Sequence, residues 1–504
     1  MRWNELTRDV TGTAQLGASN PDITGIEYDS RRITTGSVFV AMRGGSTDGN
    51  RYIETALKQG AAAIVTDTPE AFADLASNHP EIPSILVAHG RQALGELSAT
   101  FFGHPERKLH ATGVTGTNGK TTTAFLTEAL LNSAGRSSIL VGTIEYHVAG
   151  HIRPSAHTTP ESRDLFELMA DGAAQGASEL VMEVSSHALD QGRIAAVPFD
   201  VAIFTNLTRD HLDYHHTMAA YFAAKQLLFD GTRYLAPRVA VLNADDSHSE
   251  ALARAARSAG SEVITYGFHS NANWRATNIK LTPAGADFTL HSPHGTAQVH
   301  SALAGEVNIL NLLAATAASH ARGLTFDQLV TAIPKLHPVP GRFQPVSAGQ
   351  PFSVIVDYAH TDDALRNLTT LARQLVPATE GRILTLFGCG GDRDRTKRPR
   401  MGQAAGEGSD FVVVTSDNPR SEDPEAILAE ILPGVEETGV PYAVEEDRAT
   451  AIHLILSKAK PGDVVLIAGK GHEKQQILAN GAIFFDDAQV ALSALHALGY
   501  GGKR

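Results

Sequence analysis

The sequence contains a single cysteine, Cys389, among its 504 residues. One cysteine excludes an internal disulfide and a metal site built from several cysteines. Cys389 stands between glycines in the segment Phe-Gly-Cys-Gly-Gly, where a small space-filling side chain is expected more than a nucleophile. We therefore assign this thiol no chemistry.

Long apolar runs and an excess of positive charge are also absent. No apolar run approaches the ~20 residues that span a bilayer, and the first residues lack the apolar core of a signal peptide. We therefore expect a cytoplasmic protein with no membrane partner. The formal net charge of −13 gives no electrostatic footprint for nucleic acid, so we expect no nucleic-acid partner.

The chain is too long for one ordinary hydrophobic core. At about 150 residues per domain, 504 residues predict roughly three domains, and 42% hydrophobic with 19% charged residues is typical of a globular protein. Proline and glycine interrupt the patterns near residues 102–107 and 337–342, which we interpret as linkers. We therefore predict domains at residues 1–104, 105–337 and 338–504.

Short apolar strands alternate with helical stretches along the sequence, which predicts an α/β fold. We expect a small α/β domain at the N-terminus and a central α/β domain like those of P-loop ATPases. Alternating polarity predicts antiparallel hairpins within residues 279–303 of the central domain. In the C-terminal domain, apolar runs separated by helical stretches predict a Rossmann-like parallel sheet. These runs are residues 352–356, 383–387, 411–414 and 464–468.

The clearest motif lies at residues 113–121, where Gly-Val-Thr-Gly-Thr-Asn-Gly-Lys-Thr fits the phosphate-binding pattern G-x-x-x-x-G-K-[ST]. A strand pattern precedes it and a helical pattern follows. The backbone N–H groups of such a loop surround a phosphate, Lys120 can reach the β- and γ-phosphates, and Thr121 can ligate Mg²⁺. ATP is the expected ligand, with a Gly/Thr-rich turn of a Rossmann-like domain as the alternative. The residues expected to bind ATP are Gly116, Thr117, Asn118, Gly119, Lys120, Thr121 and Thr122.

Two later strands of the central domain end in polar side chains. Glu183 ends the apolar run 180–183, at the place where an ATPase with a phosphate loop positions the acid that holds Mg²⁺. The next run, 201–204, is followed by several Asp and His residues, among them His211. These residues indicate a polar site, although a solvated loop fits the sequence about as well.

Each apolar run of the C-terminal domain is followed by a polar or glycine-rich turn. The carboxyl ends of parallel strands meet at one edge of a sheet, so these turns are expected to line one crevice. Arg393, Asn418, Arg420 and Glu473 in such a crevice could recognise a zwitterion, guanidinium to carboxylate and carboxylate to ammonium. Exposed loop charges that form surface pairs are the alternative.

Several motifs of the chain occur together and in the same order in one family of enzymes. They are Gly-Thr-Asn-Gly-Lys-Thr-Thr at 116–122, Glu-Val-Ser-Ser-His at 183–187, Asp-His-Leu-Asp at 210–213, Asn308 with Asn311, Gly-Arg at 341–342 and Asp-Tyr-Ala-His at 357–360. With this set the chain resembles the Mur ligase family over nearly its whole length. Asn50 and Asp362 depart from the residues that members often have beside two of these motifs.

The resemblance implies an ATP-driven ligase of peptidoglycan precursor synthesis. Such an enzyme would transfer the γ-phosphoryl group of ATP to a carboxylate of UDP-N-acetylmuramoyl-L-alanyl-D-glutamate, and the acyl phosphate would react with the amine of meso-diaminopimelate. ATP would be the co-substrate, Mg²⁺ the metal and a monomer the working form. The alternatives are the same ligase with L-lysine, a ligase like folylpolyglutamate synthetase, and a nucleotide-driven switch ATPase.

The resemblance also implies roles for individual residues. Catalysis would depend on Lys120, Glu183, His211 and Lys225, and Lys225 would be modified to a carbamate (N6-carboxylysine). From the sequence alone, Lys225 is an ordinary helix-surface lysine. The residues implied to hold Mg²⁺ are Thr121, Glu183, His211 and the carbamate of Lys225, and those implied to serve the nucleotide, besides the phosphate loop, are Asn311, Arg342 and Asp357.

Other positions match residues that bind the two remaining substrates. Ser30 would contact the uridine end, and the segment Asp-Asn-Pro-Arg at 417–420 has the form found in members that add meso-diaminopimelate. Closure of the C-terminal domain about residues 338–341 would bring the amine to the acyl phosphate. The residues implied to hold the rest of the nucleotide-sugar peptide are Thr158, Thr159, Ser185 and Arg193, and those implied to bind diaminopimelate are Arg393, Asp417, Asn418, Arg420, Gly469 and Glu473.

Overall fold

The computed structural model describes residues 1–44, 47–282, 285–376 and 381–501. The chain divides into two compact units, and each is described by itself below. The boundary expected between residues 104 and 105 falls inside the first unit, so the three domain limits stay a prediction. The first unit comprises Met1–Arg275, Ser292–Gly295 and Leu310–Leu329, and the second comprises Ala276–His291, Thr296–Ile309 and Val330–Arg504.

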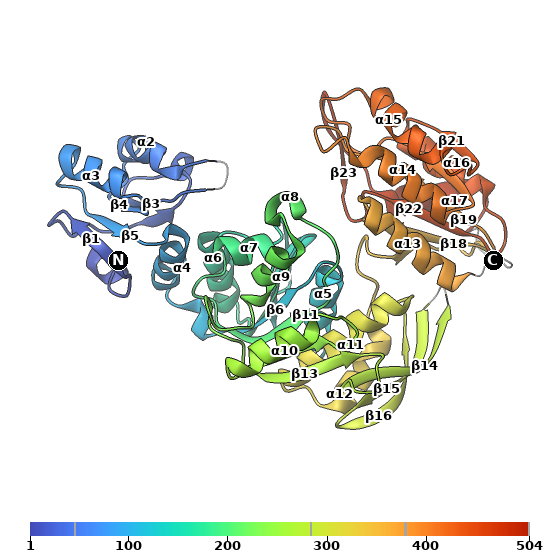
Figure 1. The fold of residues 1–504 in the computed structure, drawn as a ribbon, viewed down its shortest axis with the longest axis horizontal. Helices are drawn as coiled ribbons and strands as arrows, with labels where there is room; N and C mark the ends of the chain where they lie inside the picture. The colour runs from blue at the N-terminus through green and yellow to red at the C-terminus, as the bar shows by residue number, and fades with distance from the viewer. Residues whose placement is uncertain (45–46, 283–284, 377–380, 502–504) are drawn as a thin grey trace. The chain divides into compact units, whose positions relative to one another are not determined.

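The N-terminal part of the first unit is a five-stranded sheet (Figure 1, blue). Its strand order is β1 (Gly12–Leu16), β5 (Ser84–Val87), β4 (Ala63–Thr66), β3 (Ser37–Ala41) and β2 (Gly25–Glu27). Four strands are parallel and β1 is antiparallel to β5 at one edge. Every residue of β3 and β4 is buried, as expected for strands covered on both faces. The helices are α1 (Trp3–Leu6), η1 (Ser30–Arg32), η2 (Gly49–Tyr52), α2 (Ile53–Lys58), α3 (Pro69–Asn78), α4 (Gly90–Phe101) and η3 (Pro105–Arg107).

The central sheet is built around β6 (His110–Thr115), which leads into the phosphate loop. β6 pairs in parallel with β10 (Glu179–Glu183) on one side and with β11 (Phe199–Phe204) on the other. The loops after these three strands therefore lie at one edge of the sheet, where α/β proteins bind ligands. Beyond β11 follow β12 (Val239–Asn243) and β13 (Glu262–Gly267), and beyond β10 follow β7 (Ser138–Val141), β8 (Glu145–Val148) and β9 (His151–Pro154).

Helices connect the strands of the central sheet, as the sequence pattern predicts. They are α5 (Lys120–Ser133), α6 (Ser162–Ala174), α7 (Ser186–Gln191), α8 (Leu212–His215), α9 (Met218–Gln226), α10 (Ser249–Ser258), α11 (Glu306–Ala321), α12 (Phe326–Ala332) and η4 (Ile333–Lys335). The expected hairpins are confirmed, because β14 (Trp274–Thr282), β15 (Gly285–Ser292) and β16 (Gly295–Ser301) are hydrogen-bonded in this order. A connection as short as the one between β15 and β16 joins antiparallel neighbours.

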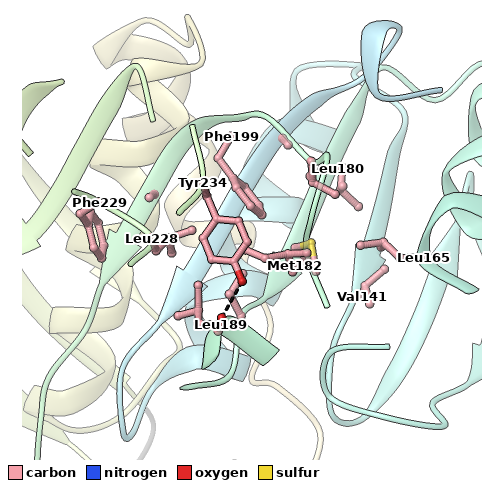
Figure 2. Close-up of a cluster of buried hydrophobic side chains, with 14 of the residues drawn as sticks. Val141, Leu165, Leu180, Met182, Leu189, Phe199, Leu228, Phe229 and Tyr234 are labelled. Carbon is pink, nitrogen blue, oxygen red and sulfur yellow. Dashed lines mark hydrogen bonds between the residues drawn. The ribbon is translucent and has the colours of Figure 1, made fainter. Parts of the chain in front are cut away.

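A large apolar cluster supports the strand that carries Glu183. Leu180 and Met182 point from β10 into this cluster, and Figure 2 shows them among residues of neighbouring elements. The hydroxyl of Tyr234 donates to the carbonyl oxygen of Leu189 at 2.5 Å, so this phenol is buried with a partner. Burial of each large apolar side chain stabilises the fold by roughly 1.5–3 kcal/mol, so packing in this cluster holds the end of β10 in place. Further members are Val141, Leu165, Phe199, Leu228 and Phe229.

The second unit contains a six-stranded sheet in which only the edge strand β17 is antiparallel to its neighbour, within the part of the chain that the structure describes. This confirms the predicted parallel sheet. The strand order is β17 (Gln344–Pro345), β18 (Ser353–Asp357), β22 (Val464–Ala468), β19 (Ile383–Phe387), β20 (Phe411–Val414) and β21 (Tyr442–Val444), and β23 (Gln475–Leu478) with β24 (Gly481–Phe484) form a separate hairpin.

Helices cover both faces of this sheet, so alternate strand residues enter two different cores. Ile355 and Leu466 pack with residues of α13 (Asp362–Leu375), α14 (Lys397–Gly408) and α15 (Pro424–Glu436). Val354 and Val465 pack with residues of α16 (Arg448–Lys458) and α17 (Asp487–Ala497). Cys389 belongs to the first core, and burial raises the pKa of its thiol to about 12, which suits a space-filling role.

Among the described residues, no helix is both long enough and apolar enough to span a membrane.

Candidate active site

The phosphate loop joins the end of β6 to the start of α5. Gly119 has a φ of +85°, and a Cβ at this position would lie 2.5 Å from Oδ1 of Asn311, so only glycine suits it. Lys120 bends back over the loop, and its Nζ donates to the carbonyl oxygens of Gly116 and Thr117 at 3.1 and 2.8 Å. The loop therefore has a cation held above its backbone, next to Asn311 of α11.

Asn206 fixes the loop from the neighbouring strand, a role that our sequence reasoning missed. It follows the end of β11, and its Oδ1 accepts from the N–H of Asn118 at 2.9 Å. Its carbonyl oxygen accepts from the N–H of Thr117 at 2.8 Å. The available signal was its place just after a buried strand next to β6.

Glu183 lies at the end of β10 and is 1% exposed. The hydroxyl of Thr121 donates to its Oε2 at 3.0 Å, and the N–H of Thr143 donates to its Oε1 at 2.7 Å. Mg²⁺ is usually bound by one or two protein ligands that act together with phosphate oxygens and water. Thr121 and Glu183 fit this requirement, and in the described ranges no group of three His, Cys, Asp or Glu side chains forms a metal site without phosphate.

Lys225 is buried, which corrects the sequence-based expectation of a helix-surface lysine. It lies on α9 and is 1% exposed. Its Nζ donates to the carbonyl oxygen of Gly116 at 2.8 Å and lies 4.4 Å from the centre of the Tyr221 ring. Burial, with a smaller contribution from the charge of Lys120, lowers the pKa of this amine well below its ordinary value. The structure therefore places a readily deprotonated amine against the phosphate loop.

His211 precedes α8 and is half-exposed, in the left-handed region with a φ of +52°. Its ring centre lies 4.9 Å from that of His187 and 6.0 Å from that of Tyr221. Burial lowers the pKa of His211, and burial together with the nearby His211 and His215 lowers that of His187 to about 4. Both imidazoles are therefore neutral near pH 7, the form in which histidine binds metals.

Three of the four residues expected to hold the muramoyl and D-glutamate end of the nucleotide-sugar peptide lie together beside Glu183. The hydroxyl of Thr159 donates to the carbonyl oxygen of Glu183 at 2.9 Å and accepts from the N–H of Ser185 at 3.1 Å. Arg193 donates from Nη1 to the carbonyl oxygen of Thr159 at 3.2 Å. Thr158, the fourth, directly precedes Thr159, and its Oγ1 lies 3.0 Å from Oγ1 of Thr143.

Ser30 lies apart from these residues, in η1 of the N-terminal sheet region. It is buried, and Asp29 caps its short helix. The neighbouring Tyr28 and Arg32 both bond Asp164 of α6, at 2.6 and 3.1 Å. These bonds join the Ser30 segment to the helix that follows the Thr158 loop.

Arg342 and Asp357 lie close together in the second unit. Asp357 ends β18, and its carboxylate accepts from the N–H groups of Phe343 and Ala359 at 2.7 and 2.9 Å. Burial raises the pKa of Asp357, while the charge of Arg342 opposes the shift. The guanidinium of Arg342 lies 4.9 Å from the centre of the Tyr358 ring. Asn311 belongs to the first unit.

The six residues expected to bind diaminopimelate follow the neighbouring strands β22, β19 and β20. Asn418 donates from Nδ2 to Oε2 of Glu473 at 2.8 Å, and Arg420 donates from Nη1 to the carbonyl oxygen of Gly391 at 2.8 Å. A Cβ at Gly390 would lie 2.9 Å from Nη1 of Arg420 and 3.8 Å from Cγ of Arg393. One at Gly469 would lie 3.8 Å from Oδ2 of Asp417. The turns thus bring both arginines and both carboxylates to one edge of the sheet.

Lys470 lies under this group of residues, and the sequence reasoning missed it. Its side chain is fully buried, and Nζ donates to Oδ1 of Asn418 at 2.9 Å and to Oε2 of Glu473 at 3.1 Å. Oδ1 of Asp417 lies 3.6 Å away. The ammonium therefore partly neutralises both carboxylates. The sequence signal that could have identified Lys470 was its position in Gly-Lys-Gly-His-Glu, the turn after an apolar run.

A second missed pair holds the strand ends in place. Arg448 of α16 and Asp487 of α17 are both fully buried and 2.7 Å apart, Nη2 to Oδ2. The same guanidinium donates to the carbonyl oxygens of Ser416 and Ala468 at 3.3 and 3.0 Å. These two residues directly precede Asp417 and Gly469. The pair therefore holds the backbone at the start of the Asp417 and Gly469 turns in place.

This chain is similar to known proteins over most of its length. Family models described as Mur ligase family, catalytic domain; Mur ligase middle domain; and Mur ligase, glutamate ligase domain match residues 22–102, 114–319 and 341–471. A UDP-N-acetylmuramoyl-L-alanyl-D-glutamate–2,6-diaminopimelate ligase of Solibacter usitatus (strain Ellin6076) is 48% identical over 95% of this chain and 94% of that protein. The chain belongs to the Mur ligase family. A ligase of the same name from Geobacillus kaustophilus (strain HTA426) is 43% identical over 95% of this chain and 96% of its own length.

Solved structures agree with this assignment. The structure of a UDP-N-acetylmuramoyl-L-alanyl-D-glutamate–2,6-diaminopimelate ligase matches with a TM-score of 0.72 and 34% identity, covering 99% of each chain. The structure of a folylpolyglutamate synthase from Mycobacterium tuberculosis, complexed with ADP and AMPPCP, matches with a TM-score of 0.60 and 19% identity, covering 82% of this chain and 96% of that one. The second likeness concerns the fold alone.

Proposed function

We propose that this Mur ligase joins meso-diaminopimelate to UDP-N-acetylmuramoyl-L-alanyl-D-glutamate with ATP as the co-substrate. The observation that carries the proposal is the group of charged side chains after β22, β19 and β20, where Arg420 follows β20 and Glu473 follows β22, the strands on either side of β19. The distal end of diaminopimelate is a zwitterion that needs a donor for its carboxylate and an acceptor for its ammonium. The names of two similar relatives, both 2,6-diaminopimelate ligases, support the same reaction.

The first step of the proposed reaction is transfer of the γ-phosphoryl group to the substrate carboxylate. A P–O bond forms to the carboxylate, the bond to ADP breaks, and an acyl phosphate results. Anionic oxygens approach one another in this step, and charges fixed beforehand lower its barrier. Lys120 supplies such a charge above the loop. The free amine of diaminopimelate then attacks the acyl carbon, a C–N bond forms, and inorganic phosphate leaves while the amine nitrogen loses a proton.

Thr121, Glu183 and His211 would hold Mg²⁺ together with the phosphates. The bound metal would supply positive charge beside the transferred group. The hydrogen bond of 3.0 Å between Thr121 and Glu183 supports a joint role for these two side chains. Asn311, Arg342 and Asp357 are proposed to serve the nucleotide, together with Gly116, Thr117, Asn118, Gly119 and Thr122.

Lys225 is proposed to be the carbamylated lysine. Only a neutral amine attacks CO₂, and burial favours the neutral form by lowering the pKa of this lysine. The nitrogen forms a bond to the carbon of CO₂ and releases one proton, which leaves a carbamate anion. In the structure Nζ of the unmodified lysine lies 2.8 Å from the carbonyl oxygen of Gly116, beside the phosphate loop. The carbamate would help to hold the metal.

Ser30 is proposed to contact the uridine end of the nucleotide-sugar peptide, and Thr158, Thr159, Ser185 and Arg193 its muramoyl and D-glutamate end. Arg393, Asp417, Asn418, Arg420, Gly469 and Glu473 are proposed to bind diaminopimelate. The predicted domain limits, a monomeric state and a cytoplasmic location belong to the same proposal.

The deciding experiment measures phosphate release and product mass with UDP-N-acetylmuramoyl-L-alanyl-D-glutamate, ATP, Mg²⁺ and a panel of amino acids. We expect a product that carries diaminopimelate, with release dependent on all substrates. A product formed preferentially with L-lysine would favour the alternative ligase. Steady ATP turnover without the nucleotide-sugar peptide, and no joined product, would point to a switch ATPase and overturn the proposal.

A further inference from the structure

Thr143 links two groups that the proposed reaction uses separately. It lies two residues after β7, and its hydroxyl oxygen is 3.2 Å from Oε2 of Glu183 and 3.0 Å from Oγ1 of Thr158. Glu183 belongs to the phosphate and metal side of the proposed site, and Thr158 to the nucleotide-sugar side. Thr143 has no role in the function proposed above.

The chemistry of these three groups gives the contacts a direction. An ionised carboxylate only accepts hydrogen bonds, and a threonine hydroxyl has one hydrogen to donate. The hydroxyl of Thr143 therefore donates to Glu183, and the hydroxyl of Thr158 donates to Thr143. The result is a continuous chain of donors from Thr158 through Thr143 to Glu183.

Close packing makes the hydrogen bonds from Thr158 through Thr143 to Glu183 sensitive to the position of the carboxylate. A Cβ at Gly142 would lie 2.5 Å from Oε1 of Glu183, so the backbone before Thr143 already approaches the carboxylate closely. Glu183 is 1% exposed and also accepts from the hydroxyl of Thr121 at 3.0 Å. The next residue of the substrate loop, Thr159, is fixed by the backbone carbonyl of Glu183 at 2.9 Å. Thr159 thus contacts the backbone of Glu183, whereas the Thr143 hydroxyl links the Thr158 side chain to the Glu183 carboxylate.

We propose that Thr143 is a positioning residue that couples nucleotide binding at the phosphate loop to binding of the nucleotide-sugar peptide. This inference rests on the proposed function. Nucleotide bound with Mg²⁺ fixes the side chains of Thr121 and Glu183, and Thr143 passes this constraint to Thr158. Because coupling between two ligands is reciprocal, each ligand then binds more tightly when the other is present.

Calorimetry tests the coupling without turnover. Binding of UDP-N-acetylmuramoyl-L-alanyl-D-glutamate to the full chain is measured with and without Mg²⁺ and a non-hydrolysable ATP analogue. We expect the analogue to tighten binding to the wild type by at least about 5-fold, and to change binding to Thr143→Val by less than about 2-fold. Thr143→Ser keeps the hydroxyl and should restore the wild-type ratio.

The valine variant retains the backbone N–H that donates to Glu183 at 2.7 Å, so binding of the nucleotide analogue alone should stay unchanged. Thr143→Ala also lacks the hydroxyl and introduces no extra volume, and it replaces the valine variant if thermal unfolding shows that valine disturbs the fold. Coupling that survives in either variant, a wild type without coupling, or a serine variant without rescue would each overturn this inference alone. A wild type that does not bind the nucleotide-sugar peptide would overturn the proposed function as well.

Discussion

Replacement of Lys225 by methionine removes the buried amine and keeps most of the side-chain volume. In the wild type Nζ has the carbonyl oxygen of Gly116 at 2.8 Å, and the side chain is 1% exposed. Methionine can fill the same space between α9 and the phosphate loop, but it has no amine to form a carbamate. We therefore expect a folded protein that has lost ligation.

The size of the pH effect follows from proton linkage. Burial lowers the pKa of Lys225 in the folded protein, whereas an unfolded lysine has a pKa of about 10.4. Between these two values the unfolded chain binds one more proton than the folded chain. The free energy of unfolding of the wild type should therefore rise with pH, relative to Lys225→Met, by about 1.4 kcal/mol per pH unit. This difference in slope ends above the unfolded pKa and below the folded pKa.

The assay compares the two proteins in CO₂-free buffer at a series of pH values below about 10.4, the pKa of the unfolded lysine that bounds the window from above. Denaturant unfolding gives the free energy, and hydrogen exchange at α9 reports the region that contains Lys225. CO₂ is then added. A carbamate that forms only in the folded state should stabilise the wild type by about 1.4 kcal/mol at a free CO₂ concentration ten times its dissociation constant. The methionine variant should not respond.

Lys58 provides a matched control because it is an exposed lysine in the last turn of α2. Lys58→Met should keep the pH dependence and the CO₂ response of the wild type. Parallel stability curves for the wild type and Lys225→Met would show that the buried amine carries its proton in the folded protein. Ligation at the wild-type rate in Lys225→Met would refute the proposed carbamate.

Three further substitutions test other parts of the site. Lys120→Ala should abolish ligation without loss of the fold, because the ammonium is held above the phosphate loop, and a folded variant with normal ligation would contradict its role. Arg420→Ala should reduce the preference in kcat/KM for meso-diaminopimelate over L-lysine by about thirty-fold to several-thousand-fold, which corresponds to roughly 2–5 kcal/mol; an unchanged preference would exclude Arg420 as the selector. Asp487→Asn leaves the charge of the buried Arg448 uncompensated and should destabilise the second unit by about 3–5 kcal/mol in denaturant unfolding, whereas a change within about 0.5 kcal/mol would contradict the importance of this pair.

The α/β fold and the phosphate loop could be predicted from the sequence because their signals are local. The loop requires glycine, lysine and threonine at fixed spacing, and the strand that ends in Glu183 is a short apolar run. The parallel arrangement of the second unit also followed from apolar runs separated by helices. Parallel strands end at one edge, so the order of runs and turns along the chain was enough to group the side chains after β22, β19 and β20.

Burial and the partners of polar side chains were decided only by the tertiary structure. The sequence places Lys225 on a helix and does not show which face is covered, and its hydrogen-bond partner is 109 positions away. Lys470 likewise bonds Asn418, 52 positions away, and Thr143 reaches Glu183 across 40 positions. Local periodicity fixes the element and the face on which a residue lies. The packing of distant segments decides whether that face is dry, which charge lies opposite, and therefore the pKa and chemistry of the side chain.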